Sequence, residues 1–310
     1  MNNKRIVFIV GPTAVGKTEI ALKLAKLLDA EIISADSRYL YRGMNIGTAK
    51  PSQKELGEVN HHLIDVTDVT ENWSLSIFRN HAIKSIKSTI KRGKLPLIVG
   101  GTGQYIFSIL EGWQIPELAP NFRLRELLED WENEIGQDAF FSKLEILDPQ
   151  AARLIDKRNK RRTIRALEVI LLTGRLFSSL RKKQPIEYPF KIIGLTRERK
   201  LLYQRIDNRI DMMIKEGFIQ EVENLIKRGY HFDLPAMSAI GYKEIGLYLS
   251  EKNDLDESVR LIKKRTHQFV RRQANWFKKD DPRIMWFDLE VTNEKHIEEY
   301  IKSANGWLNE

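Results

Sequence analysis

A glycine-bounded segment near the N-terminus carries the residue types that hold phosphate. It matches the phosphate-binding pattern G-x-x-x-x-G-K-[ST] in full. In such a loop, backbone N–H groups surround the phosphate oxygens, the lysine neutralises their charge and the final hydroxyl can bind Mg²⁺. A chance turn before a helix is the alternative, but the apolar run in front of this segment is the context that a true loop needs. The eight residues are Gly11, Pro12, Thr13, Ala14, Val15, Gly16, Lys17 and Thr18.

A carboxylate follows the next apolar run of the chain. Asp36 stands two residues after Glu31–Ser34, a run with the composition of a short strand. Ligands of open α/β folds bind where parallel strands end, so Asp36 could bind a metal or act as a general base. A helix cap or a surface turn is the other interpretation. The apolar run Leu95–Val99 ends in Gly100-Gly101-Thr102, so the carboxylate that holds Mg²⁺ in many phosphoryl-transfer enzymes is missing there.

Strands alternating with helices must position these residues. Apolar runs predict strands at Lys4–Val10, Glu31–Ser34, Leu95–Val99, Phe190–Leu195 and Ile284–Phe287. Helical patterns lie at residues 104–110, 122–134, 161–172, 201–216, 219–228, 242–249 and 255–278. The alternation predicts an α/β fold with a P-loop NTPase-like parallel sheet flanked by helices. A charged helical insertion, residues 116–189, divides the catalytic core into residues 1–115 and 190–310.

Composition limits the classes of protein that this chain can belong to. Its 310 residues are 42% hydrophobic and carry a formal net charge of +9. There is no cysteine, which excludes disulfides, a thiol nucleophile and Cys-ligated metal. The six histidines show no metal-ligand spacing. No apolar run approaches the roughly 20 residues of a membrane span, so we expect a cytoplasmic protein with no membrane partner.

Two basic clusters are candidates for contact with a nucleic acid. One is the run Lys157–Arg162 with Arg165, inside the helical insertion. The other places Arg271-Arg272 close to Trp276 and Phe277, and basic residues interleaved with aromatics suit unpaired bases. Solvated basic faces and buried aromatic anchors are the alternatives.

Several segments in the same order resemble the tRNA dimethylallyltransferases (tRNA isopentenyltransferases) of bacterial type. Beyond the loop, they are Ile33–Tyr39, Tyr41–Pro51, His61–Asp65, Val99–Tyr105, Arg165–Val169, Gly241-Tyr242 and Arg272–Phe277. The string Gly-Met-Asn-Ile-Gly-Thr-Ala-Lys-Pro, residues 43–51, is specific, because kinases share the loop but not this string.

The resemblance implies transfer of a dimethylallyl group from dimethylallyl diphosphate to N6 of an adenine in tRNA. That adenine is at position 37, three-prime of the anticodon, in tRNAs that read codons beginning with U. Asp36 then matches the general base, Arg209 an arginine near the diphosphate, and Thr102 a further residue of the active site. Mg²⁺ is the implied cofactor, with Thr18 as its ligand, and Thr13 could donate its hydroxyl to the donor. The target base would be flipped out of its stack, and a monomer is expected.

The resemblance also implies the residues that contact tRNA. The target nucleotide is held by Asp36, Ser37, Arg38 and Tyr39. Further contacts are expected from Thr102, Arg123, Arg161, Arg162, Thr163, Ile164, Arg165, Arg271, Arg272 and Gln273. The chain departs from the family's usual residues at Gln104, Arg161, Ser238 and His267, none of which belongs to the loop or to Asp36.

Two other functions stay open at this point. A small-molecule kinase would use the loop for ATP, and a non-catalytic nucleic-acid binder would keep the loop without chemistry. The missing carboxylate after Val99 and the basic insertion count against the kinase, and Asp36 within its motif counts against the binder. Whether ATP also binds the loop is not decided by the sequence.

Overall fold

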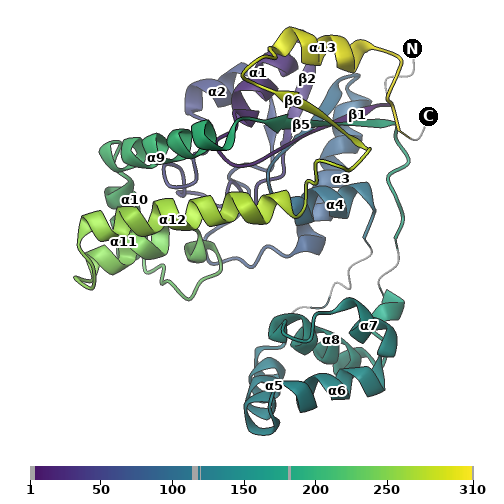
Figure 1. Ribbon diagram of the computed structural model, residues 1–310, viewed down its shortest axis with the longest axis vertical. Coiled ribbons are helices and arrows are strands. Elements are labelled where there is room, and N and C mark those ends of the chain that lie inside the picture. The colour runs from purple at the N-terminus through teal and green to yellow at the C-terminus, as the bar shows by residue number, and fades with distance from the viewer. Residues whose placement is uncertain (1–3, 114–117, 119, 181–182, 309–310) are drawn as a thin grey trace. The chain divides into compact units, whose positions relative to one another are not determined.

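The computed structural model describes residues 4–113, 118, 120–180 and 183–308, which form two compact units (Figure 1). The first unit comprises Met1–Leu110 and Glu187–Glu310, and the second comprises Glu111–Ile186. The proposed start of the insertion at Pro116 lies outside the described residues. Each unit is described by itself below.

A parallel sheet forms the centre of the first unit. Its six described strands are β1 (Ile6–Val10), β2 (Ala30–Ser34), β3 (His61–His62), β4 (Leu95–Val99), β5 (Phe190–Thr196) and β6 (Ile284–Asp288). They pair in the order β3-β2-β4-β1-β5-β6, and every pairing is parallel. All five residues of β1 are buried, as expected for a central strand covered on both faces. The predicted parallel α/β fold is confirmed.

The strand order determines which face of the sheet some helices of this unit cover. They are α1 (Lys17–Leu27), α2 (Gln53–Glu58), α3 (Leu75–Lys91), α4 (Gly103–Leu110), α9 (Arg199–Lys215), α10 (Phe218–Lys227), α11 (Tyr242–Leu249), α12 (Leu255–Ala274) and α13 (Glu294–Lys302), with a short 3-10 helix η2 (Ala236–Ser238). The chain crosses the sheet in one direction from β1 to β2 and in the other from β3 to β4. Because such crossovers are right-handed, α1 and α3 cover opposite faces. Figure 1 shows α13 beside α1, and α4 beside α3.

Most predicted boundaries agree with the structure to within two residues, but several elements differ. The strand β3 was not predicted, because two residues are too few for any periodicity, and the helices α2 and α3 were not predicted either. The helix predicted to run to Lys278 is wrong at its end, because α12 stops at Ala274. Trp276 and Phe277 both donate their backbone N–H to the carbonyl of Gln273, and this turn carries Phe277 into the core against Phe107.

The second unit is a small helical bundle with its own core. It contains α5 (Phe122–Ile135), α6 (Gln137–Leu147), α7 (Pro149–Leu154) and α8 (Lys160–Thr173), with a 3-10 helix η1 (Ser178–Leu180). Leu128, Phe140, Leu144 and Leu167 are among its buried side chains. The Asp148 carboxylate accepts the backbone N–H of Ala151 and of Ser178, so it caps α7 and holds the chain that follows α8.

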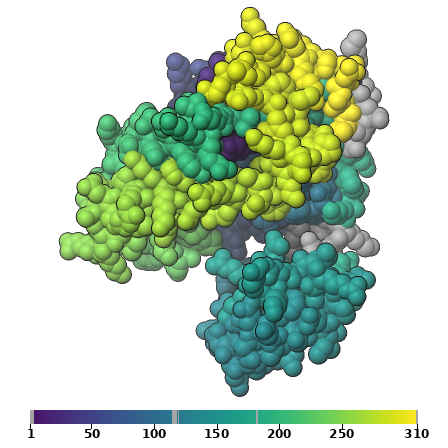
Figure 2. Space-filling view, viewed as in Figure 1, coloured from purple at the N-terminus to yellow at the C-terminus, as the bar shows by residue number. Residues whose placement is uncertain are grey.

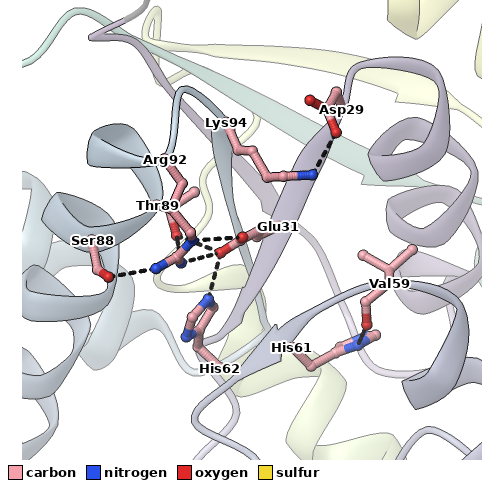
Figure 3. Close-up of polar contacts among 9 residues, drawn as sticks. All are labelled: Asp29, Glu31, Val59, His61, His62, Ser88, Thr89, Arg92 and Lys94. Carbon is pink, nitrogen blue, oxygen red and sulfur yellow. Dashed lines mark hydrogen bonds and ion pairs between the residues drawn. The ribbon is translucent and has the colours of Figure 1, made fainter.

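A buried carboxylate joins α3 to the edge of the sheet. Glu31 in β2 accepts hydrogen bonds from the Arg92 guanidinium and the Thr89 hydroxyl at the end of α3, and its Oε2 lies 2.7 Å from His62 Nε2 in β3 (Figure 3). Burial alone would raise the pKa of the Glu31 carboxyl. The hydrogen bonds from Arg92, His62 and Thr89 outweigh burial and hold this pKa well below its usual range.

Glu31→Gln is expected to lower the free energy of unfolding by about 3 kcal/mol at pH 7. Breaking a buried ion pair leaves its partner uncompensated, and the Arg92 side chain, 42% exposed, limits the cost by reaching water. Because the folded-state pKa is depressed, the stabilisation is present above the unfolded pKa and is lost as pH falls from there through the folded pKa. Urea unfolding at pH 7 and pH 3 should therefore show a smaller difference between the two proteins at the lower pH. An equal difference at both pH values would contradict this assignment.

Candidate active site

The phosphate-binding loop lies between β1 and α1, at the edge of the sheet where the parallel strands end. Gly11 has a φ of 145°, and a Cβ there would lie 2.6 Å from the Leu195 carbonyl oxygen of β5. Only glycine therefore lets the chain leave β1 so close to β5. Within the loop, Lys17 Nζ donates to the carbonyls of Gly11 and Pro12 at 3.0 and 2.8 Å. The lysine is thus held inside the loop that it serves.

Three arginines from the second half of the chain hold the outer side of this loop. Arg197 Nε donates to the Val15 carbonyl at 3.0 Å, and Arg205 Nε donates to the Ala14 carbonyl at 3.1 Å. Arg209 donates to the Thr13 hydroxyl at 2.7 Å. The loop leads directly into α1, whose first N–H groups have no partner within the helix and therefore suit an anion. Figure 2 shows a small purple area of N-terminal residues in a hollow between the green α9 and the yellow-green C-terminal segment.

The turn after β2 fixes Asp36 by its backbone contacts. Asp36 Oδ1 accepts the Arg38 backbone N–H at 2.9 Å, so one carboxylate oxygen holds the turn. The Thr102 hydroxyl accepts the Ser37 backbone N–H at 3.3 Å. Gly100 makes this approach feasible, because a Cβ there would lie 2.3 Å from the Ala35 carbonyl oxygen. Asp36 and Thr102, predicted from separate motifs, therefore stand side by side.

Two cavities meet at Asp36. The first, about 480 Å³, is lined by the loop residues Thr13, Lys17 and Thr18 together with segment 48–51 and Arg205. The second, about 440 Å³, has an apolar wall: Ile210, Met213, Phe218, Ala239, Ile240, Ile262, Phe269 and Trp276. Thr13, Asp36, Thr48, Arg209, Phe269 and Gln273 line both cavities. A polar chamber beside an apolar one, with a carboxylate at the junction, suits a reaction between an anionic group and a flat or branched apolar one.

Burial lowers the pKa of the Lys17 ammonium to about 8, while the nearby Asp36 carboxylate raises it and the Arg209 guanidinium lowers it. These three groups therefore lie within electrostatic reach of one another. An anion between Lys17 and Arg209 would restore the charge that burial disfavours.

Affinity for inorganic diphosphate is accordingly expected to fall as pH rises above about 8. A lysine with a depressed pKa is charged below that value and neutral above it, so binding above pH 8 requires uptake of a proton. We expect the dissociation constant to rise by about tenfold between pH 8 and pH 9.5. Calorimetric titration measures it, with Lys17→Arg as control, because a guanidinium keeps its charge over this range. A profile as steep in Lys17→Arg as in the natural chain would assign the effect to another group.

The oxygen ligands at the site fit a magnesium ion held together with a phosphate. Thr18 lines the first cavity at the start of α1. The described residues contain no group of three or more His, Asp or Glu side chains that could hold a metal without help. Mg²⁺ usually keeps several waters and shares its coordination between one or two protein oxygens and substrate phosphates. Thr18 is therefore a fitting protein ligand.

The predicted RNA-contacting residues of the first unit divide into lining and supporting positions. Ser37 lines the second cavity and Tyr39 the first. Arg38 donates to the carbonyls of Pro235 and Ala236 at 2.9 and 3.2 Å, so it ties η2 to the Asp36 turn. Gln273 is buried: its carbonyl oxygen accepts the Thr13 N–H, and its amide donates to the Gly101 carbonyl.

The end of α12 exposes two basic side chains. Arg271 and Arg272 lie in its last turn. Arg272 lines the second cavity, and its Cζ atom lies 5.7 Å from the centre of the Phe269 ring. Trp276 also lines that cavity, whereas Phe277 is buried in the core. One of the two aromatic residues is thus available to a ligand.

In the second unit, the residues predicted to contact tRNA include both exposed and buried positions. Arg123, Arg161 and Arg162 are exposed, whereas Thr163 and Ile164 are buried in the core. Arg165 donates to the buried Glu168 carboxylate at 2.6 Å and to the Leu118 carbonyl at 3.1 Å. Within residues 161–165, it is therefore chiefly Arg161 and Arg162 that expose their side chains to solvent.

Sequence reasoning missed one residue that shapes the site. The Glu221 carboxylate in α10 accepts the backbone N–H groups of Asn45, Ile46 and Gly47 at 2.7 to 3.1 Å and the Tyr242 hydroxyl at 2.6 Å. It thereby fixes segment 45–51, part of which lines both cavities. A lone glutamate on a charged helix gives no sequence signal for this role.

Comparisons with known proteins agree on one family. A family model described as IPP transferase matches residues 39–280. The tRNA dimethylallyltransferase of Roseiflexus castenholzii is 48% identical over 88% of this chain and 90% of its own length, and that of Alkaliphilus metalliredigens is 41% identical over 99% of both. A tRNA isopentenylpyrophosphate transferase structure from Bacillus halodurans has a TM-score of 0.71 and 40% identity, covering 96% of this chain and 95% of its own. A eukaryotic dimethylallyltransferase acting on tRNA has a TM-score of 0.79 at 25% identity, covering 97% and 76%.

Proposed function

Because this chain belongs to the IPP transferase family, we propose that it is a tRNA dimethylallyltransferase. It transfers the dimethylallyl group of dimethylallyl diphosphate to N6 of the adenine at position 37 in tRNAs reading codons that begin with U. The products are N6-isopentenyladenosine in tRNA and diphosphate. The observation that carries the proposal is the junction of a phosphate-binding cavity and an apolar cavity at Asp36. The names of the relatives support prenylation of tRNA, and none favours the kinase alternative.

The polar cavity is suited to the diphosphate of the donor. Backbone N–H groups of the loop, the Lys17 ammonium and the Arg209 guanidinium would surround its oxygens. When the carbon–oxygen bond of the donor breaks, the electron pair stays on the diphosphate. Preorganised donors aimed at that developing charge lower the barrier, because they need no reorganisation during the reaction. The Thr13 hydroxyl, already bonded to Arg209, lies where it can donate to the same group.

Asp36 is suited to accept the proton that the reaction releases. The N6 amine attacks the first carbon of the dimethylallyl group, a new nitrogen–carbon bond forms and the carbon–oxygen bond to diphosphate breaks. The amine then loses one proton, which the Asp36 carboxylate accepts. Because Oδ1 is held by Arg38, Oδ2 is the oxygen that we assign to this task. The Thr102 hydroxyl, an acceptor for Ser37, keeps its own proton to donate to the base and so can orient it.

We propose Mg²⁺ as the cofactor, with Thr18 as its protein ligand. When bound, the ion would neutralise charge on the diphosphate. The protein's own contribution is the hydroxyl of Thr18 and the cationic wall formed by Lys17 and Arg209. ATP has no assigned role in this proposal.

For tRNA, we propose contacts from both units. In the first unit these are segment 36–39, Thr102, Arg271, Arg272 and Gln273, and in the second unit Arg123 and segment 161–165. Exposed arginines bind phosphates and release counterions, so affinity for tRNA should fall with salt. We further propose that the enzyme is a monomer and acts in the cytoplasm. None of the described helices is both long and apolar enough to cross a membrane.

A transfer assay tests the proposed function directly. It combines the protein, Mg²⁺, labelled dimethylallyl diphosphate and unmodified tRNA with adenines beside the anticodon. Label should enter the RNA and should fail to do so when the target adenine is replaced by guanine. If label stays out of RNA while ATP is consumed with a small acceptor, the proposal is wrong and the kinase alternative stands.

A further inference from the structure

The Gln273 side chain lies between two segments that carry the candidate active site. The residue is only 4% exposed, and it lines both cavities. Its Oε1 accepts the backbone N–H of Thr13 at 2.9 Å, and its Nε2 donates to the carbonyl of Gly101 at 3.0 Å. Thr13 belongs to the loop that follows β1, and Gly101 follows β4, the strand paired with β1. One amide therefore joins the segments that leave two neighbouring strands.

The chemistry of these two bonds suits a neutral amide. A backbone N–H can only donate and a carbonyl can only accept, so the group between them must accept at one end and donate at the other. A carboxylate could not donate to Gly101, and an ammonium could not accept from Thr13. Space is limited as well, because a Cβ at Gly101 would lie 2.2 Å from Nε2 of Gln273. The glycine and the glutamine are thus matched in size and in polarity.

The end of α12 holds Gln273 in place. Its backbone carbonyl accepts the N–H groups of Trp276 and Phe277 at 3.0 and 3.1 Å. Both of these rings stack on Phe107 of α4, with ring centres 5.9 and 6.1 Å apart, and Phe277 is buried. The amide is therefore carried by a packed turn and not by a free helix end.

The two partners of the amide lead to opposite sides of the proposed reaction. The Thr13 hydroxyl accepts a hydrogen bond from Arg209 at 2.7 Å, on the side assigned to the diphosphate. Gly101 precedes Thr102, whose hydroxyl accepts the backbone N–H of the residue after Asp36 at 3.3 Å. The amide thus connects the side that holds the leaving group to the side that accepts the proton.

We propose that Gln273 is a positioning residue that sets the distance between the diphosphate in the loop and the adenine held beside Thr102 and Asp36. This rests on the proposed function, which supplies both substrates. The attacking nitrogen must meet the donor carbon at close range, and a displacement of about 1 Å can lower the rate by about a hundredfold. The two bonds use one of the two amide hydrogens, so this role is separate from the contact with RNA proposed above.

The first test is Gln273→Met, which keeps the length of the side chain and removes both hydrogen bonds. We expect the single-turnover rate of prenyl transfer, measured with saturating donor and tRNA, to fall by about a hundredfold. The dissociation constants for donor and tRNA should stay within about fivefold, because one neutral hydrogen bond contributes little to binding. Gln268→Met is the matched control, since it makes the same substitution at an exposed position of α12, and it should change none of these values.

The second test, Gln273→Glu, separates positioning from general stability. When protonated, the new carboxyl accepts at one oxygen and donates at the other, as the amide does, whereas the ionised form cannot donate to Gly101. Burial favours the protonated form of a carboxyl. The transfer rate of this variant, divided by that of the natural chain at the same pH, should therefore rise about tenfold from pH 8 to pH 6. Groups that titrate in both proteins, Asp36 and Lys17 included, cancel in this ratio.

The outcomes of the two tests are distinguishable. If Gln273→Met transfers label at the natural rate, the inference is wrong while the proposed function stands. A loss confined to tRNA affinity, with a natural rate in the bound complex, also overturns it and leaves Gln273 as an RNA contact only. Equal losses of rate in Gln273→Met and in Gln273→Glu at every pH, with a lower melting temperature, would indicate a merely structural role. If the natural chain itself transfers no label, the proposed function fails, and this inference fails with it.

Discussion

Replacing Asp36 with asparagine is expected to lower the rate of prenyl transfer in the bound complex by about three orders of magnitude. The amide cannot take the proton that the N6 amine must lose. Its oxygen can still accept the Arg38 N–H, so the turn that carries segment 36–39 should keep its shape. The dissociation constant for tRNA is therefore expected to stay within about twofold, an effect on turnover and not on binding.

Single-turnover kinetics with saturating donor and tRNA measure this rate, and filter binding measures the affinity. Asp29→Asn is a suitable control, because Asp29 is 78% exposed and pairs with Lys94 where β2 begins, whereas Asp36 follows the end of that strand. Weakened tRNA binding with normal turnover per bound complex would show that Asp36 holds the substrate instead of accepting a proton.

Replacing Glu168 with glutamine is expected to destabilise the second unit by about 3 kcal/mol. The fully buried carboxylate accepts four hydrogen bonds: two from Arg125, one from Arg165 and one from the Asn121 N–H. Burial by itself would raise the pKa of this carboxyl, but its bonds to Arg125, Arg165 and Asn121 hold the pKa below the usual range. A glutamine oxygen can accept only part of this set, and its amide group would face a guanidinium.

Hydrogen exchange on the full chain locates the effect. Amides of α5 and α8 should exchange about a hundredfold faster, while those of the sheet should not change. Glu129→Gln, an exposed carboxylate on the same helix α5, serves as the matched control. Equal acceleration in the sheet would mean that the two units unfold together and that Glu168 stabilises the whole chain.

The residues predicted most clearly from sequence are those in contiguous motifs. The loop before α1 and Asp36 after β2 were recognisable because a predicted strand precedes each of them. That strand places their residues at the edge of the sheet where parallel strands end. Arg209 was expected near the diphosphate through resemblance alone, since a pair of arginines one turn apart usually marks a solvated face. Its bond to the Thr13 hydroxyl spans 196 positions of sequence, and no local pattern encodes that distance.

The basic run of the second unit shows why charge patterns predict less. Composition treats Arg161, Arg162 and Arg165 alike, yet the helical period of α8 turns Arg165 toward Glu168 and leaves the other two in solvent. The same period buries Thr163 and Ile164. Glu221 was missed for a related reason: its partners are backbone N–H groups, and these have no signature in the sequence.

The phosphate-binding loop precedes in the chain the three arginines that hold it, Arg197, Arg205 and Arg209. This order determines when the site can form during synthesis. The loop is among the first segments to leave the ribosome, and its three holders are translated only after the whole second unit. The central strand β1 likewise has a neighbour on both sides only after β5 has been translated. A nascent chain is therefore expected to complete its helical bundle first and to acquire an ordered anion site only after Arg209 has been translated. Until then, growing chains should be inert toward the donor.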